Sequence, residues 1–313
     1  MTTKLAIVFP GQGSQSVGML AELYQQHDIV KQTFAEASAA LGYDLWALVA
    51  NGPEAELNET QRTQPALLTA SVAVWRLWQQ QNGQTPAYFA GHSLGEYSAL
   101  VCAGVLTLAA AVTLVEKRGN YMQQAVPAGV GAMSAIIGLD DAAIIKACAD
   151  AAQGEVVSAV NYNSPGQVVI AGHKAAVERA GELCKAAGAK RALPLPVSVP
   201  SHCALMRPAA EQLLLDLNQL SFNLPSVPVI NNVDVAAATS GAEIKDALVR
   251  QLYSPVRWTE TIEFLASQGV SQILEFGAGK VLTGLIKRID KTISTAAVGD
   301  QASLETALNQ EQE

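Results

Sequence analysis

Gly91-His92-Ser93-Leu94-Gly95 follows the apolar run Ala87-Tyr88-Phe89-Ala90 and precedes a segment of helix formers, Glu96 to Ala103. A Gly-x-Ser-x-Gly sequence between a strand and a helix is typical of a nucleophile elbow, a sharp turn that lifts the serine oxygen clear of the sheet. Such a turn strains the serine backbone, and a side chain two residues to either side would clash, so glycine is expected there. A glycine-rich loop with an incidental serine is the alternative; the flanking elements favour the elbow.

The chain alternates short β-branched runs with longer helical patterns, which is typical of an α/β protein with a mainly parallel sheet. We expect strands of this sheet at Leu5–Phe9, Ala87–Ala90, Val227–Asn231, Gln272–Glu275 and Ile293–Ala297. The expected helices are Leu20–Ala40, Gln64–Gln80, Leu94–Ala103, Thr107–Ala125, Met206–Leu217, Glu243–Leu252, Trp258–Ser267, Lys280–Ile289 and a weaker one at Ser303–Asn309.

The middle of the chain has a different pattern. Its expected elements run strand, helix, strand, strand, helix, strand: Ala132–Ile137, Asp140–Ala152, Val156–Asn161, Gln167–Ala171, Lys174–Ala187 and Arg191–Val197. That order is the ferredoxin-like motif. We therefore expect a small inserted domain at 128–198 and a large domain formed by residues 1–127 and 199–313. An active site is expected in the cleft between them.

Composition excludes several classes of protein. Of the 313 residues, 50% are hydrophobic and 15% are charged, so the chain can bury a sizeable core and is not disordered. The formal net charge of −8 argues against nucleic acid as the main partner. The four cysteines are widely spaced without a Cys-x-x-Cys pair, which indicates reduced thiols in a cytosolic protein rather than a zinc site or a disulfide framework.

Two apolar stretches bear on membranes and export. Leu5–Phe9 is followed at once by Pro10-Gly11, which indicates a first strand and no signal peptide. Tyr97–Val115 carries no charge and comes near the lower length limit for a spanning helix. Gly104 interrupts it, however, and Thr107 fits the N-cap of a second helix. We expect two buried helices, no transmembrane segment and a cytoplasmic protein.

Ser93 needs a base to become a nucleophile, and the chain offers four histidines. His27 lies on an expected surface helix, where it would be solvated. His92 lies inside the elbow but is expected to point away from Ser93, and His173 begins a helix of the insert, where capping or surface exposure is expected. His202 stands where the chain returns from the insert to the large domain, so it is the candidate base, with a structural role as the alternative.

Two further features bear on the chemistry of this serine. Arg118 lies at the edge of the apolar stripe of the expected helix Thr107–Ala125, and an inward-facing guanidinium suits a bound carboxylate. The alternatives are an arginine that reaches solvent or one that pairs with an internal acid. Gly11 and Gly13 after the first strand let its backbone approach a ligand, a position that suits the second oxyanion donor.

Taken together, these residues resemble the malonyl-CoA:acyl-carrier-protein transacylases of bacterial fatty-acid synthesis over nearly the whole chain. The resemblance rests on Phe9-Pro10-Gly11-Gln12-Gly13-Ser14-Gln15, Thr63-Gln64-Pro65-Ala66, Gly91-His92-Ser93-Leu94-Gly95-Glu96-Tyr97, Arg118, Asn163-Ser164-Pro165, Pro200-Ser201-His202 and Gln251-Leu252-Tyr253. The fold of that family is a hydrolase-like α/β domain with a ferredoxin-like insert, in agreement with the organisation expected above.

The resemblance implies a ping-pong reaction. Ser93 takes the malonyl group from malonyl-CoA with His202 as base, and the phosphopantetheine thiol of acyl carrier protein then accepts it. The backbone N–H groups of Gln12 and Leu94 are implied at the oxyanion, and Arg118 at the free carboxylate of the malonyl group. Coenzyme A enters as part of the substrate. No metal, no other cofactor and a monomer are expected.

The resemblance also implies how the histidine is oriented. Lipase-type triads place an acid between serine and histidine in the chain, but no compelling acid of the large domain lies between Ser93 and His202. For this purpose the family uses a main-chain carbonyl near the position of Gln251, and Asp234 is the alternative orienting group. We also include Gln251 in the predicted substrate site. Two other functions stay open, a serine esterase or thioesterase and a non-catalytic scaffold that binds carrier protein.

Overall fold

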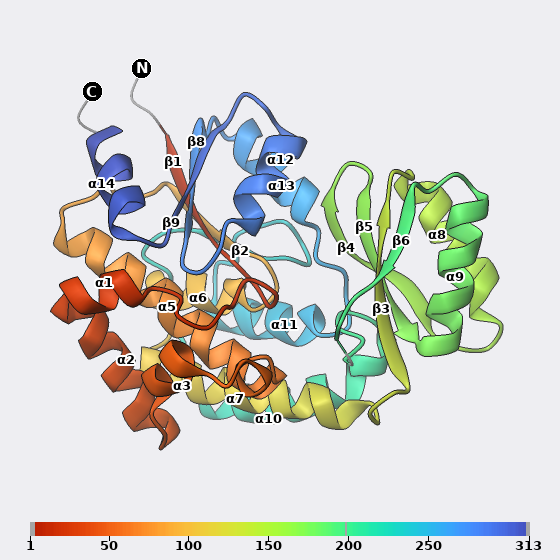
Figure 1. Cartoon of the computed structure of the whole chain (residues 1–313), viewed down its shortest axis with the longest axis horizontal. Coiled ribbons are helices and arrows are strands. Elements are labelled where there is room, and N and C mark those ends of the chain that lie inside the picture. Colours follow the sequence, from red (N-terminus) through yellow and green to blue (C-terminus); the bar gives the residue numbers. More distant parts are fainter. Residues whose placement is uncertain (1–3, 198, 311–313) are drawn as a thin grey trace.

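A computed structural model describes residues 4–197 and 199–310 of the chain. Within these residues the larger sheet has five parallel strands in the order β7-β2-β1-β8-β9. Figure 1 labels β1, β2, β8 and β9 of this sheet. They are β1 (Leu5–Phe9), β2 (Tyr88–Gly91), β7 (Val229–Ile230), β8 (Gln272–Phe276) and β9 (Ser294–Val298). The predicted parallel sheet is confirmed, although β7 is shorter than expected because Asn231 turns back to bond Ala236.

The central strand β1 is buried on both faces, as its unbroken apolar sequence requires. Its odd-numbered residues pack in a core that includes helices α5 (Thr60–Gln80) and α7 (Leu108–Ala125). Its even-numbered residues point to the opposite face, against α12 (Trp258–Ser267) and α13 (Val281–Ile289). The larger sheet therefore lies between two helical layers.

The expected helix Leu20–Ala40 is wrong as a single element. The structure has α1 (Ala21–Gln26) and α2 (Asp28–Leu41), with His27 in extended conformation between them. The Nε2 atom of His27 lies 2.7 Å from Oε1 of Gln301, so the ring is half-buried rather than solvated. This contact with the C-terminal helix joins segments far apart in the sequence, which helical periodicity does not reveal.

Two short helices were not expected, α3 (Leu45–Asn51) and α4 (Glu54–Leu57). Asp44 caps the first of them by accepting a hydrogen bond from the Ala47 N–H at 2.9 Å. The remaining helical elements outside residues 131–194 are α6 (Gly95–Cys102), η1 (Ala204–Met206), α10 (Arg207–Gln219), α11 (Gly241–Gln251) and α14 (Gln301–Gln310).

The uncharged stretch Tyr97–Val115 forms parts of two helices, as predicted. Gly104, with a φ of 78°, ends the turn after α6, and the Thr107 side chain caps α7 by accepting from the Ala110 N–H. Across the described ranges, we find no helix with both the length and the apolar character needed to cross a membrane.

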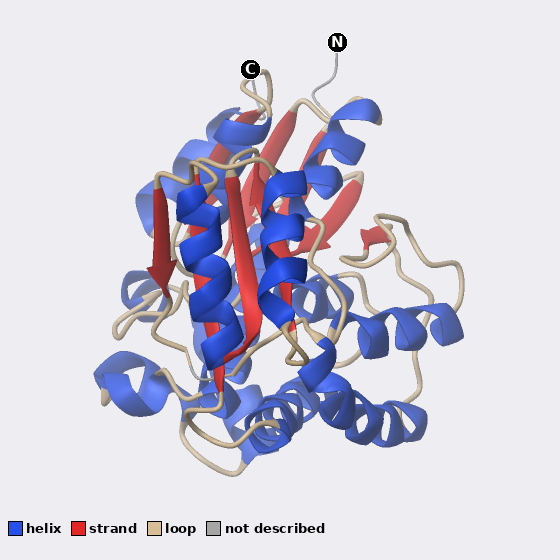
Figure 2. Cartoon of the chain, turned by 90° about the vertical axis from the view of Figure 1, so that its right-hand side faces the viewer, coloured by secondary structure: helices blue, strands red, loops and turns tan. Residues whose placement is uncertain are grey.

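The predicted ferredoxin-like motif is confirmed. Its elements are β3 (Gly131–Ile137), α8 (Asp141–Ala152), β4 (Val157–Ser164), β5 (Gln167–His173), α9 (Lys174–Ala186) and β6 (Arg191–Pro194). The strands form an antiparallel sheet in the order β4-β5-β3-β6, and α8 and α9 lie across one of its faces (Figure 2). The domain limits stay a prediction, since positions 1–3, 198 and 311–313 lie outside the described residues.

Candidate active site

The elbow predicted from Gly91 to Gly95 is present between β2 and α6. Ser93 has a φ of 52°, a left-handed conformation that side chains rarely adopt. A Cβ at Gly91 would lie 1.9 Å from the carbonyl carbon of Gly95, and a Cβ at Gly95 would lie 2.0 Å from the carbonyl oxygen of Phe9. The two glycines therefore let the turn fold on itself and against the end of β1, and Ser93 lies half-buried at its tip.

Ser93 and His202 come together although 109 residues separate them. The Ser93 Oγ lies 2.8 Å from Nε2 of His202, and Nδ1 of His202 lies 2.7 Å from the main-chain carbonyl oxygen of Gln251. A carbonyl only accepts hydrogen bonds, so Nδ1 carries the hydrogen and Nε2 presents its lone pair to the serine hydroxyl. Burial, reinforced by the positive charge of Arg118, lowers the pKa of His202 to about 3. The imidazole is therefore neutral at neutral pH.

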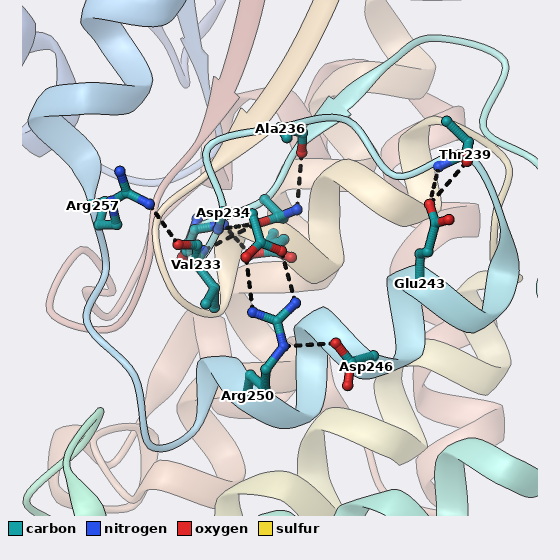
Figure 3. A network of polar contacts seen from close by, with 11 residues as sticks. Val233, Asp234, Ala236, Thr239, Glu243, Asp246, Arg250 and Arg257 are labelled. Atoms are coloured by element: carbon teal, nitrogen blue, oxygen red, sulfur yellow. Dashed lines mark hydrogen bonds and ion pairs between the residues drawn. The ribbon is translucent and has the colours of Figure 1, made fainter.

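Asp234, the rival orienting group, is engaged elsewhere. Its two carboxylate oxygens accept hydrogen bonds of 2.9 and 2.7 Å from the guanidinium of Arg250 (Figure 3). Those hydrogen bonds lower the pKa of Asp234. The group that contacts His202 Nδ1 is the Gln251 carbonyl, as the family resemblance implied.

We expect Asp234→Asn to keep the transfer rate within about threefold of the unchanged protein, because partly exposed ion pairs contribute little. The measurement is the steady-state rate of the acyl transfer that the resemblance implies. Asp246→Asn is the matched control, since Asp246 pairs with the same Arg250 at 2.6 Å. A loss of activity in Asp234→Asn but not in Asp246→Asn would show that the Asp234 carboxylate orients His202.

Arg118 is buried, with 1% of its surface exposed, and its guanidinium faces Ser93. Nη1 donates to Gln64 Oε1 at 2.8 Å, and Nη2 donates to Gln251 Oε1 at 3.0 Å and lies 3.4 Å from the Ser93 Oγ. Its Nε atom is buried without a hydrogen-bond partner among the described residues. The arginine neither reaches solvent nor forms an ion pair with an internal acid within those ranges, which leaves a buried positive charge beside the serine.

One of the two predicted oxyanion donors lies in the elbow and the other lies in a loop packed against it. Leu94 immediately precedes α6, and Gln12 lies in the loop after β1. A Cβ at Gly11 would lie 2.5 Å from the His92 carbonyl oxygen, so this loop packs directly on the elbow. Neither the Gln12 N–H nor the Leu94 N–H donates to an acceptor within the described ranges, and both are available to a ligand.

The other histidines have structural contacts. His92 Nε2 lies 2.8 Å from Oδ1 of Asn163 on β4, which ties the elbow to the smaller sheet and turns the ring away from Ser93, as predicted. His173 makes no side-chain cap; its Nδ1 instead accepts the Val156 N–H at 2.9 Å. The active-site serine thus lies where the two sheets meet.

Sequence reasoning assigned no role to Asn232. Its Oδ1 accepts the Ser93 N–H at 2.8 Å and its Nδ2 donates to the Gly91 carbonyl at 2.6 Å, so one amide holds both sides of the strained turn. The signal was available, because Asn232 follows β7 at the carboxyl end of the strand beside β2, where ligand sites form in parallel sheets. Gln64 and Glu96 stood in the quoted motifs without a role.

All four cysteines have free, buried thiols. The described part of the chain holds no group of three or more His, Cys, Asp or Glu side chains placed to bind a metal ion.

An α/β fold with a serine on an elbow, a neutral histidine beside it and a buried arginine defines a site suited to acyl transfer. The family model described as the acyl transferase domain matches residues 6–306, and the chain belongs to that family. A malonyl CoA-acyl carrier protein transacylase of Salmonella typhimurium is 68% identical over 308 residues, which cover 98% of this chain and 100% of that protein. Its counterpart of the same name in Escherichia coli K12 is 67% identical over 306 residues, or 98% and 99% of the two chains.

Solved structures agree. The crystal structure of an acyl carrier protein S-malonyltransferase from Vibrio cholerae has 70% identity and a TM-score of 0.96, covering 97% of this chain and 99% of that one. A malonyl-transacylase in complex with a holo acyl-carrier protein of a type II PKS has 65% identity and a TM-score of 0.98, covering 98% and 100%. The hydrolase-like fold with a ferredoxin-like insert expected from the sequence is thereby confirmed.

Proposed function

We propose that this protein transfers the malonyl group of malonyl-CoA to the phosphopantetheine thiol of acyl carrier protein, through a malonyl-serine intermediate. The observation that carries the proposal is the meeting of an imidazole and a guanidinium at one serine oxygen. The Ser93 Oγ lies 2.8 Å from a neutral imidazole nitrogen and 3.4 Å from a buried guanidinium nitrogen. The first contact suits attack on a thioester, and the second suits an acyl group that ends in a carboxylate.

In the first half-reaction, the Ser93 Oγ attacks the thioester carbonyl while His202 Nε2 takes the hydroxyl proton. The tetrahedral oxyanion accepts hydrogen bonds from the backbone N–H groups of Gln12 and Leu94. On collapse, the carbon–sulfur bond breaks and His202 returns the proton to the sulfur of coenzyme A. Loss of one oxyanion donor costs about 3–4 kcal/mol in comparable sites, so both loops must be held rigidly.

The second half-reaction runs the same steps in reverse with a different thiol. His202 Nε2 takes the proton of the phosphopantetheine thiol, whose sulfur attacks the malonyl ester, and the proton then passes to the departing Ser93 oxygen. The carbonyl of Gln251 holds the imidazole in one tautomer throughout. Arg118 binds the malonyl carboxylate in both halves, with Gln251 as its neighbour in the substrate site.

Intact mass spectrometry tests the proposal against its rivals. After mixing with malonyl-CoA, we expect a malonyl adduct on the protein that persists in water and disappears when holo acyl carrier protein is added. An adduct that water removes equally fast without carrier protein would indicate an esterase or thioesterase. Complete absence of an adduct, with carrier protein still bound, would indicate a scaffold.

The remaining features of the proposal follow from the substrates. Coenzyme A serves as a carrier of the acyl group, and no metal or prosthetic group takes part. We place the protein in the cytoplasm as a monomer that binds neither nucleic acid nor membrane, in keeping with its net charge of −8.

Carrier proteins are usually acidic, so docking on this acidic chain requires a local basic patch. We place the patch on both sides of the Gly166–Gln167 turn. Lys190 packs against Gly138, whose N–H donates to Gly166, and Arg288 donates to Gln167 Oε1 at 2.5 Å. Lys190, Arg191, Lys287 and Arg288 are all exposed.

Charge reversal at Lys190 and Arg191 is expected to raise the KM for carrier protein about tenfold, because steering charges act on association. The KM for malonyl-CoA is expected to stay unchanged. Charge reversal at Lys31 and Lys146, which lie on other helices and form local ion pairs, alters the net charge equally and serves as the control. Equal effects on both substrates would reject the patch.

A further inference from the structure

Glu96 is a buried carboxylate beside the active site, and the reaction steps above do not use it. It is 2% exposed and forms no ion pair with Lys, Arg or His in the described ranges. Its Oε2 atom accepts hydrogen bonds from the Asn232 N–H at 2.9 Å and from Gln251 Nε2 at 2.8 Å. Its Oε1 atom has no hydrogen-bond partner among those residues.

The Gln251 side chain connects Glu96 to Arg118. Nε2 of Gln251 donates to Glu96 and, at 3.0 Å, to the Ser93 carbonyl, while Oε1 accepts from Arg118 Nη2 at 3.0 Å. A carboxylate only accepts and a guanidinium only donates, so the two ends of the amide cannot exchange. Glu96 thereby fixes the amide orientation that holds Arg118 next to Ser93.

The charges of this cluster balance only while no acyl group is bound. Arg118 and an ionised Glu96 carry opposite charges, one amide apart, in a region shielded from water. A malonyl carboxylate on Arg118 would add a second buried negative charge, and burial of an uncompensated charge is costly. Protonation of Glu96 removes the excess negative charge.

The surroundings of Glu96 make it the group that titrates. The pKa of Glu96 is raised to about 7, mainly by burial and in part by the negative charge of Asp234 after β7. Its two hydrogen bonds and the positive charge of Arg118 on α7 act in the opposite direction. Glu96 also lines a small cavity with mostly apolar walls. The pKa of Tyr97, on the same helix, is about 12, and that of His202 is about 3, so neither changes charge near neutral pH.

We propose that Glu96 is a positioning residue for acyl selection: it orients Gln251 against Arg118 and takes up one proton from solvent, on Oε1, when a carboxylate-bearing acyl group binds. This inference rests on the proposed function, because it needs the acyl carboxylate at Arg118. Binding that raises the pKa of Glu96 favours the protonated protein, so affinity falls as pH rises above the pKa of the free state.

The test is calorimetric binding to Ser93→Ala protein, which cannot be acylated at this position, in buffers of different ionisation enthalpy. Malonyl-CoA is compared with acetyl-CoA, which has the same nucleotide part and no acyl carboxylate. We expect malonyl-CoA to take up close to one proton more than acetyl-CoA above pH about 7, with its Kd rising up to about tenfold per pH unit. This comparison needs no change at Glu96.

Glu96→Gln in the same background keeps a hydrogen-bond acceptor and removes the titration. We expect the extra proton uptake to vanish and the Kd for malonyl-CoA to become independent of pH. Glu275→Gln is the control, since Glu275 is equally buried but bonds the first turn of α13. If malonyl-CoA binding depends on Arg118 but takes up no more protons than acetyl-CoA binding, this inference is wrong and the proposed function stands. Malonyl-CoA bound no more tightly than acetyl-CoA at any pH would overturn the proposed function as well.

Discussion

Ser93→Ala protein is expected to form no adduct with malonyl-CoA and to transfer malonyl groups at least about 10⁴-fold more slowly. The substitution removes the oxygen that lies 2.8 Å from His202 Nε2 and 3.4 Å from Arg118 Nη2. His202 then has no nucleophile to activate, although substrate binding should survive. Intact mass spectrometry reports the adduct, and the steady-state rate reports transfer.

Ser98→Ala is the matched control for this experiment. Ser98 is buried on the same helix, α6, and its Oγ has no hydrogen-bond partner among the described residues, so its removal costs little. We expect the control to acquire the adduct at the normal rate. A malonyl adduct that persists in Ser93→Ala would show that another residue is the nucleophile.

Arg118→Ala is expected to lower kcat/KM for malonyl-CoA on the order of 10³-fold, since loss of one partner of a buried charge pair costs about 2–5 kcal/mol. Acetyl transfer should rise, because the shortened side chain leaves space and removes a buried charge that a neutral acyl group cannot satisfy. The measurement is kcat/KM for malonyl-CoA and acetyl-CoA with the same carrier protein.

Lys117→Ala provides the comparison on the same helix. Lys117 is exposed and pairs with Asp216 at 2.6 Å, so its loss should leave both substrates unaffected. Arg118→Lys separates charge from geometry, because an ammonium keeps the charge but lacks the planar fork that binds a carboxylate through two bonds. Malonyl transfer undiminished in Arg118→Ala would exclude the arginine from acyl recognition.

The sequence was most informative where a structure depends on near neighbours. The elbow needs glycine at 91 and 95 because the turn packs upon itself and against β1, and this requirement can be recognised in five consecutive residues. The strands and the insert were likewise predicted from local periodicity. The expected single helix at Leu20–Ala40 is interrupted at His27, which is extended and contacts Gln301, 274 residues further along the chain. A contact at that separation leaves no mark on helical periodicity.

The sequence by itself thus determined the α/β fold, the ferredoxin-like insert, and Ser93, His202 and Arg118 as candidates, since each carries a local signature of shape or chemistry. Only the tertiary structure decided which partners they have. Asn232 lies 139 residues from Ser93, and Gln251 lies 155 residues from Glu96. Burial removes water from these polar groups, so each must form a hydrogen bond with another group of the protein. Which groups meet depends on how distant segments of the chain pack together.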